Sequence, residues 1–205
     1  MIARKPATLT DIEAAALPVV ASTAWQMVFD HARITAGQRL LVLGAAGSVG
    51  AYALQLASFA GAHVTAAARA SQRDDVRSLG AAEVIDAEAD PFERVNECSF
   101  DVVLDTIGGG MLQRSFALLR PGGIIVSVAA QPDPAEAARH SVRAVFFLVD
   151  VSTASLDRIA AVIEAKTLQH PRIGEVLPLS QARLAHEMLA GRPHKSGKIV
   201  LVPGS

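Results

Sequence analysis

The sequence predicts an α/β fold with a doubly wound parallel sheet of six strands, helices on both faces and a small C-terminal appendage. Residues 40–69 form the pattern of a strand, a glycine turn, a helix and a second strand. Strand-like and helix-like segments then alternate regularly up to residue 166, which favours parallel strands joined by right-handed crossovers. Hydrophobic residues make up 51% of the chain and aromatic ones only 4%. The core is therefore expected to consist of Ala, Val, Leu and Ile, as in sheets covered by helices.

Two helices are expected before the first strand. Thr10-Asp-Ile-Glu13 is a capping box, in which the Thr hydroxyl and the Glu carboxylate each satisfy a free backbone N–H group. The helix that follows is expected to end at Leu17, because Pro18 disfavours helical backbone in the residue before it. Residues 21–32 predict a second helix, which carries Trp25, Val28 and Phe29.

The alternating part of the chain is divided by residues that interrupt regular structure. Gly37 precedes the first strand, Gly80 ends a helix, and Pro121-Gly-Gly123 stops another. Between these breaks the apolar periodicity gives strands at 40–43, 64–68, 84–85, 101–105, 124–128 and 144–149. It gives helices at 49–59, 73–79, 111–119 and 155–166, with short helical segments at 91–96 and 134–140. After Pro171 the appendage is expected to contain a strand at 173–177, a helix at 180–189 and a strand at 198–202.

The glycine turn after the first strand is typical of dinucleotide-binding, Rossmann-type folds. Glycines stand at 44, 47 and 50, and Ala45 holds the place where the usual fingerprint begins. Small residues let backbone N–H groups approach a pyrophosphate, toward which the next helix points its positive end. Residues 40–68 contain no Asp, Glu, Lys or Arg, so a membrane span and a glycine turn that binds nothing are the alternatives for this stretch. The Gly- and Ala-rich middle favours the turn and its small-residue helix face over the span.

The end of the second strand indicates which nucleotide binds. NAD-binding units place an acidic residue there to bind the ribose 2′-hydroxyl, but this chain has no carboxylate until Asp74. Arg69, Ser71 and Arg73 stand there instead, and two guanidinium groups with a hydroxyl suit a 2′-phosphate. The sequence therefore favours NADPH over NADH. The alternative is that both arginines are solvated surface charges.

Several functional classes are excluded by what the sequence lacks. The single tyrosine, Tyr52, has Leu56 rather than Lys four places later, which excludes the short-chain dehydrogenases as an enzyme class. No P-loop or nucleophile-elbow pattern follows the strands. The net charge of −1 is unlike that of a nucleic-acid-binding protein. The lone Cys98 excludes an internal disulfide and a cysteine-based zinc site.

Metal-binding and targeting signals are absent as well. The six histidines show no metal-ligand spacing, so no metal is expected. The first residues lack the apolar core of a signal peptide, so we expect a cytoplasmic protein that does not enter a membrane.

Six segments together resemble the zinc-independent branch of the medium-chain dehydrogenase/reductase superfamily, and most closely its quinone oxidoreductases of the zeta-crystallin type. They are residues 17–25, 37–50, 79–86, 101–109, 119–126 and 197–201. The resemblance implies NADPH-dependent hydride transfer to a small-molecule substrate, namely a quinone or an activated alkene or carbonyl. A non-catalytic NADPH-binding module or sensor is the alternative, and a structural domain that binds no nucleotide is a third.

The same resemblance implies a domain organisation. Its members have an N-terminal, GroES-like catalytic domain that forms the other wall of the active-site cleft, and nothing in this chain corresponds to it. We therefore expect an N-terminal helical lead-in (1–35), an NADP-binding Rossmann domain (36–170) and a segment that would complete the catalytic domain (171–205). Because half of the cleft is absent, little turnover is expected from the isolated chain.

The resemblance also implies roles for individual residues. Backbone at Ala46, Gly47, Ser48 and Val49 would contact the pyrophosphate, with Gly50 allowing close packing of helix on strand. Arg69, Ser71 and Arg73 would hold the 2′-phosphate, while Thr106, Ile107, Val128 and Ala129 would line the ribose and nicotinamide side at the carboxyl ends of strands. Thr23 would lie near the nicotinamide, although an ordinary helix hydroxyl explains it equally well.

No catalytic acid or base can be identified from the sequence. Asp101 and Asp105 flank the fourth strand and are interpreted as strand-entry and turn residues. Phe147–Val149 would lie near the cleft, although core or interface packing explains Phe146 and Phe147 better. The strand at 144–149 is apolar on both faces and is expected at a sheet edge, which invites pairing with another chain. We therefore expect a homodimer through this strand, as the family resemblance also implies.

Overall fold

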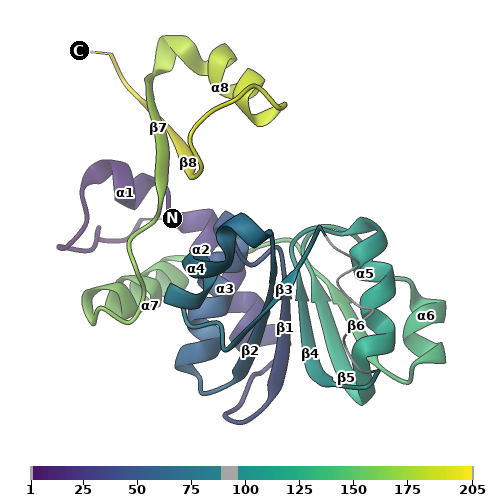
Figure 1. The fold of residues 1–205 in the computed structure, drawn as a ribbon. Helices are drawn as coiled ribbons and strands as arrows, with labels where there is room; N and C mark the ends of the chain where they lie inside the picture. The colour runs from purple at the N-terminus through teal and green to yellow at the C-terminus, as the bar shows by residue number, and fades with distance from the viewer. Residues whose placement is uncertain (1, 89–96, 205) are drawn as a thin grey trace. The chain divides into compact units, whose positions relative to one another are not determined.

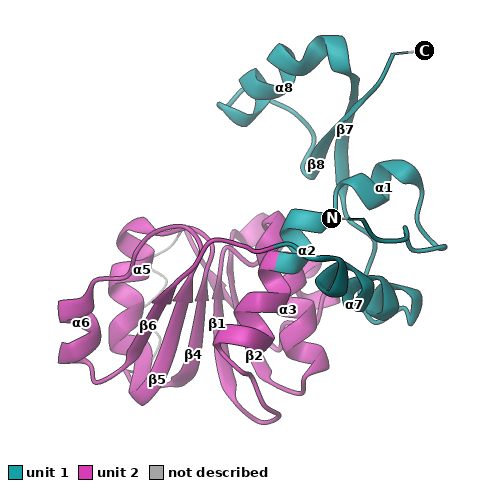
Figure 2. Ribbon diagram, turned by 180° about the vertical axis from the view of Figure 1, so that it is seen from behind, with its two compact units in different colours: residues 1–22, 151–205 teal, residues 23–150 magenta. Residues whose placement is uncertain are grey.

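The computed structural model describes residues 2–88 and 97–204 (Figure 1). The chain forms two compact units (Figure 2). Unit 1 consists of Met1–Ser22 and Val151–Ser205, and unit 2 consists of Thr23–Asp150. The predicted division into domains at 1–35, 36–170 and 171–205 stays a prediction, since a compact unit of a structure is not always an independent domain.

Unit 2 contains a parallel sheet of six strands, which confirms the predicted fold class. The strands lie in the order β3-β2-β1-β4-β5-β6 (Figure 1). Their bounds are β1 (Arg39–Leu43), β2 (His63–Ala68), β3 (Glu83–Asp86), β4 (Phe100–Asp105), β5 (Leu119–Ser127) and β6 (Arg143–Phe146). The order reverses between β1 and β4, and this switch point is where open parallel sheets bind ligands.

Helices cover the sheet of unit 2 on both sides. Helix α3 (Ser48–Phe59) packs against β1 and β2, and α5 (Gly109–Ser115) and α6 (Pro134–Arg139) lie on the other side (Figure 1). Side chains of β1 alternate between the two faces. Leu41 and Leu43 form one buried cluster with Phe100, Leu112 and Phe116, which joins α5 and the 3₁₀ turn after it to the sheet.

The second predicted helix differs from the observed one in its start and in its hydrogen bonding. Helix α2 (Pro18–Trp25) begins at a proline, which suits the first helical position because that position needs no N–H group. A π-helix, η1 (Gln26–His31), continues it, and the Ala32 N–H bonds the Met27 carbonyl oxygen at 3.0 Å. Apolar spacing predicts a helix here but does not reveal the wider turn.

The predicted stop at Pro121-Gly-Gly123 is wrong, because these residues lie inside β5. Helix α5 ends earlier than expected and is followed by the 3₁₀ helix η3 (Phe116–Leu118), so that β5 begins at Leu119. The pairing of β4 with β5 shifts register between Phe100 and Val102. Such an irregularity accommodates a proline, which cannot donate to the ladder.

Strand β6 lies at one edge of the sheet as predicted, but it ends at Phe146 rather than at Val149. The segment after it is held by other contacts. The Phe147 ring packs on the His31 ring with centroids 4.2 Å apart. The Gln26 side-chain amide bonds both the N–H and the carbonyl oxygen of Asp150. These contacts with η1 direct the chain away from the ladder.

The other predicted elements of unit 2 are found within two residues of their expected ends. They include α4 (Arg73–Ser78), which follows the 3₁₀ helix η2 (Ala70–Gln72). The expected helical segment at 91–96 lies outside the described residues.

Unit 1 contains α1 (Asp11–Ala15), α7 (Thr153–Glu164) and a parallel pair of strands, β7 (Ile173–Pro178) and β8 (Lys198–Val202). The 3₁₀ helix η4 (Leu179–Gln181) and α8 (Ala182–Leu189) connect the two strands. The predicted capping box of α1 is present, and its Glu13 carboxylate also contacts Nδ1 of His170 at 3.0 Å. Among the helices of the described residues, none is long and apolar enough to cross a membrane.

Candidate functional site

The glycine turn lies at the switch point, between the end of β1 and the start of α3. Gly44 has a φ of +78°, a left-handed conformation that favours glycine. The Gly47 N–H closes the turn on the Gly44 carbonyl oxygen at 2.9 Å. Gly47 is the N-cap of α3 and has no side chain to cap the helix. The first-turn N–H groups of a 12-residue helix thus have no side-chain cap, as an anion-binding helix terminus requires.

Glycine is needed at two positions of this turn because neighbouring groups fill the space that a Cβ atom would occupy. A Cβ on Gly44 would clash with Oγ1 of Thr106 and lie 2.8 Å from Cγ1 of Ile107. A Cβ on Gly50 would clash with the Gly44 carbonyl oxygen and lie 2.9 Å from the Cα of Ala45. The turn and the first residues of α3 are therefore in close backbone contact at Gly50.

The loops after β4 and β5 are joined by a fully buried carboxylate, that of Asp105. Its Oδ1 accepts hydrogen bonds from the N–H groups of Ile107 (3.1 Å) and Gly108 (2.9 Å). Its Oδ2 accepts from the hydroxyl of Ser127 at 2.6 Å. The Ser127 oxygen in turn accepts from the N–H groups of Ala129 and Ala130, each at 3.2 Å. One network thus fixes the backbone of both loops.

Thr106 ties the loop after β4 to the end of β1. Its N–H and its hydroxyl both donate to the Leu43 carbonyl oxygen, at 3.2 and 2.8 Å. Ile107 follows with 49% of its surface exposed. The Val128 N–H bonds the Asp105 carbonyl oxygen at 3.1 Å. The structure therefore brings four predicted residues, Thr106, Ile107, Val128 and Ala129, to the carboxyl ends of β4 and β5.

The predicted phosphate-binding side chains lie at the carboxyl end of β2, which is next to the glycine turn. The Ala45 N–H bonds the Ala67 carbonyl oxygen at 3.3 Å, so the turn touches the last residues of β2. Arg69, Ser71 and Arg73 are all exposed on the short segment that follows. The Arg69 Nε atom contacts Oε1 of Glu88 at 3.2 Å.

Thr23 differs from these residues in the kind of element that carries it. It lies in α2, is only 5% exposed, and belongs to a helix rather than to a loop at the end of a strand. Its place near a nicotinamide stays a prediction.

Two features of this region were not anticipated from the sequence. The joining role of Asp105 and Ser127 depends on residues 22 positions apart, and a polar residue that ends a strand is the one local signal for it. The contact of Glu88 with Arg69 depends on the pairing of β2 with β3, which adjacent sequence does not show.

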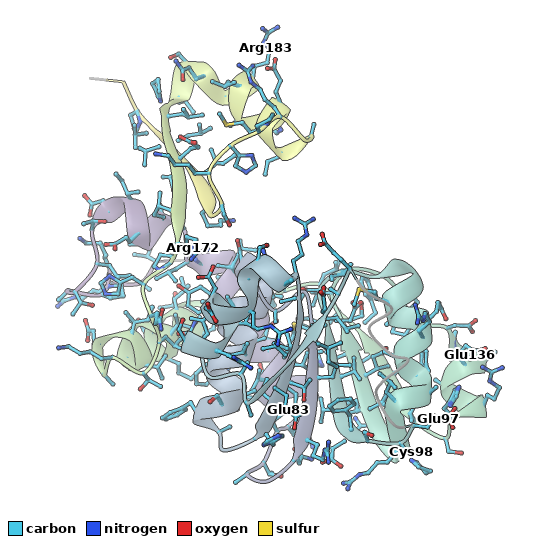
Figure 3. The ribbon with its side chains drawn as sticks, in the orientation of Figure 1. Glu83, Glu97, Cys98, Glu136, Arg172 and Arg183 are labelled. Atoms are coloured by element: carbon cyan, nitrogen blue, oxygen red, sulfur yellow. The ribbon has the colours of Figure 1, made fainter. Side chains whose placement is uncertain are left out.

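Unit 2 also contains a cavity that lies outside the predicted site residues. A cavity of about 610 Å³ lies beside α5 and α6, and Glu97 and Glu136 are among its lining residues (Figure 3). None of the predicted site residues lines it. Within residues 2–88 and 97–204, no three His, Cys, Asp or Glu side chains gather in a way that could hold a metal ion.

Comparisons with known proteins agree with this architecture. The family model described as zinc-binding dehydrogenase matches residues 79–201. A mitochondrial NAD(P)H oxidoreductase of Danio rerio is 38% identical over 126 residues, which cover 58% of this chain and 33% of that protein. A probable zinc-binding oxidoreductase, also mitochondrial, of Arthroderma benhamiae is 29% identical and covers 98% of this chain and 65% of its own. The chain thus spans between a third and two thirds of these relatives.

Solved structures give the same result. An alcohol dehydrogenase superfamily protein from Novosphingobium aromaticivorans superposes with a TM-score of 0.86 at 30% identity, over 98% of this chain and 67% of that one. The quinone oxidoreductase from Coxiella burnetii superposes with a TM-score of 0.85 at 28% identity, over 97% of this chain and 62% of that one. The chain therefore belongs to the zinc-binding dehydrogenase family, within the medium-chain dehydrogenase/reductase superfamily.

Proposed function

We propose that this chain is the cofactor-binding part of an NADPH-dependent oxidoreductase that reduces a quinone or an activated alkene or carbonyl compound. The observation that carries the proposal is the glycine turn at the switch point, from which α3 starts with no side-chain cap on its first turn. Names of relatives support it, since they include NAD(P)H oxidoreductases, a 2-methylene-furan-3-one reductase of Solanum lycopersicum and a quinone oxidoreductase.

The residues present fit a dinucleotide. N–H groups at Ala46–Val49 would hold the pyrophosphate, because the N-cap of α3 is Gly47 and no side chain caps the first turn of that helix. Arg69, Ser71 and Arg73 would hold a 2′-phosphate. When bound, NADPH supplies the hydride for the reaction.

The protein's contribution at the other end of the cofactor is to position it and to exclude water. Val128 and Ala129 follow β5 on backbone that Ser127 fixes, and Ile107 exposes an apolar side chain beside Gly44. Both oxygens of Asp105 already accept hydrogen bonds from the protein. We therefore give Asp105 a positioning role and name no proton donor. This lack of a candidate acid or base favours the second function, an NADPH-binding module or sensor.

We also propose that the reaction needs no zinc, that the protein is cytoplasmic and that it forms homodimers. The first point follows the resemblance of the six segments to the zinc-independent branch of the superfamily. Two relatives are mitochondrial by name, so a mitochondrial location is the alternative for the second. The edge position of β6, with partly buried Val145 and Phe146, supports the third. A clean monomer on a sizing column would contradict dimer formation.

A fluorescence titration of the purified chain with NADPH and NADH tests the proposed function. We expect saturable NADPH binding, weaker NADH binding, and loss of the difference in the double variant R69A/R73A. The matched control is R77A, which removes an exposed arginine from the last turn of α4. Absence of binding by either nucleotide would overturn the proposal. Binding without turnover of a simple quinone would favour the module over the enzyme.

A further inference from the structure

A carboxylate is held next to the predicted phosphate-binding arginine by the backbone of two neighbouring strands. The β2–β3 pairing places Ala68 opposite Asp86. The pairing continues one residue further, because the Ala87 N–H bonds the Ala68 carbonyl oxygen at 3.0 Å. The Glu88 N–H then bonds Oδ1 of Asp86 at 3.0 Å. These hydrogen bonds hold the backbone of Glu88 beside Arg69.

The two side chains meet in the charged contact already described, between Nε of Arg69 and Oε1 of Glu88 at 3.2 Å. Arg69 is held on its other side by the bond from its N–H to Oε1 of Gln72, also at 3.2 Å. A carboxylate and a phosphate bind guanidinium N–H groups in the same way, so they compete for them.

We propose that Glu88 is a specificity-determining residue that lowers the preference of this site for NADPH over NADH. It occupies Arg69 when no 2′-phosphate is bound, and it repels that phosphate when the nucleotide arrives. The inference rests on the proposed function, because it assigns Arg69 to the 2′-phosphate. NADH carries a hydroxyl in place of the phosphate, so Glu88 opposes its binding far less.

The size of the effect follows from the exposure of the pair. Both side chains are about two-thirds exposed, at 66% for Arg69 and 67% for Glu88. Exposed ion pairs are weak and are screened by salt. Releasing Arg69 from such a pair corresponds to a change in NADPH affinity of about two- to fivefold, which decreases as the salt concentration rises.

The test compares E88Q with E83Q in titrations with NADPH and NADH at low and high salt. Glu83 begins β3 at the opposite end of the strand, and its carboxylate contacts Nε2 of His63 at 3.2 Å (Figure 3). Both variants remove one negative charge, so they share any general effect of net charge. We expect E88Q to bind NADPH two- to fivefold more tightly at low salt, with NADH affinity unchanged and E83Q like the wild type. Equal behaviour of the two variants, or an equal gain for NADH, would overturn the inference.

A second experiment, with R69A variants, distinguishes an error in the role of Glu88 from an error in the proposed function. In an R69A background the competition is absent, so we expect E88Q to change NADPH affinity less than it does in the wild type. A wild-type chain that discriminates against NADH through Arg69, with no effect of E88Q, contradicts the role of Glu88 alone. A wild-type chain with no preference for NADPH, or none that R69A removes, contradicts the assignment of the 2′-phosphate and the inference with it.

Discussion

Replacing Asp105 by Asn should weaken both the fold and nucleotide binding, because one buried carboxylate holds two loops of the candidate site. An Asn oxygen in place of Oδ1 keeps the bonds from Ile107 and Gly108. The Asn amide group then faces the Ser127 hydroxyl, which already donates in that direction at 2.6 Å. One hydrogen bond to a charged group is lost, which costs about 1.5–3 kcal/mol. For a chain of this length, a loss of about 2 kcal/mol corresponds to a fall in Tm of roughly 4–8 °C.

The assay is urea unfolding together with NADPH titration of D105N, and D101N is its matched control. Asp101 lies at the other end of β4, accepts from the Arg39 N–H at 2.7 Å and pairs with Arg120. Both variants should lose stability, but only D105N should weaken NADPH binding. The double variant D105N/S127A should cost less than the sum of its parts, because both changes break one network. Strict additivity, or a D105N protein as stable as the wild type, would refute the reasoning.

Two further perturbations test the turn and the N-terminal capping box. In urea unfolding, G50A should lose roughly 1–3 kcal/mol of unfolding free energy, since the added Cβ meets the backbone of the glycine turn. G110A is the matched control and should not lose stability, because the Cβ added at Gly110 meets no neighbouring atom within 4 Å. Equal effects would contradict the packing argument. Bonds from the Thr10 N–H and hydroxyl, followed by His170, lower the pKa of Glu13. Wild type should therefore exceed E13Q in stability above the ordinary glutamate pKa, and the difference should vanish as pH falls through the lowered value. Unfolding curves at pH 7 and at a series of acidic pH values below the ordinary glutamate pKa check this, and a pH-independent difference would count against it.

The sequence predicted the parallel sheet well because its signals are local. A buried strand, a glycine turn and an apolar helix follow one another within residues 40–69, and their spacing alone defines the unit. The errors arose where distant contacts override local preference. Pro121 and its glycines belong to a strand because β4 offers an irregular partner, and β6 ends early because Gln26 holds Asp150.

The candidate site, too, could be predicted only where its signals are local. Positions of the glycines and of the residues after β4 and β5 could be predicted, since any parallel sheet brings the carboxyl ends of its strands together. Contacts between side chains from different strands could not. The pairs Asp105–Ser127 and Arg69–Glu88 are set by register and by order in the sheet, which one sequence does not display.

The two hydrogen bonds between the Gln26 side chain and the Asp150 backbone, here called the Gln26–Asp150 clasp, affect the order in which the chain folds. Unit 1 joins distant segments, as in the bond from the Ala7 N–H to Glu164, which spans 157 positions. Unit 2 is continuous, and the clasp closes it across 124 positions. Once unit 2 is folded, the loop that unit 1 must close is several times shorter, which lowers its entropic cost by on the order of 1 kcal/mol. Residues 23–150 are therefore expected to fold first, during synthesis, with the remainder closing afterwards as a fast local step.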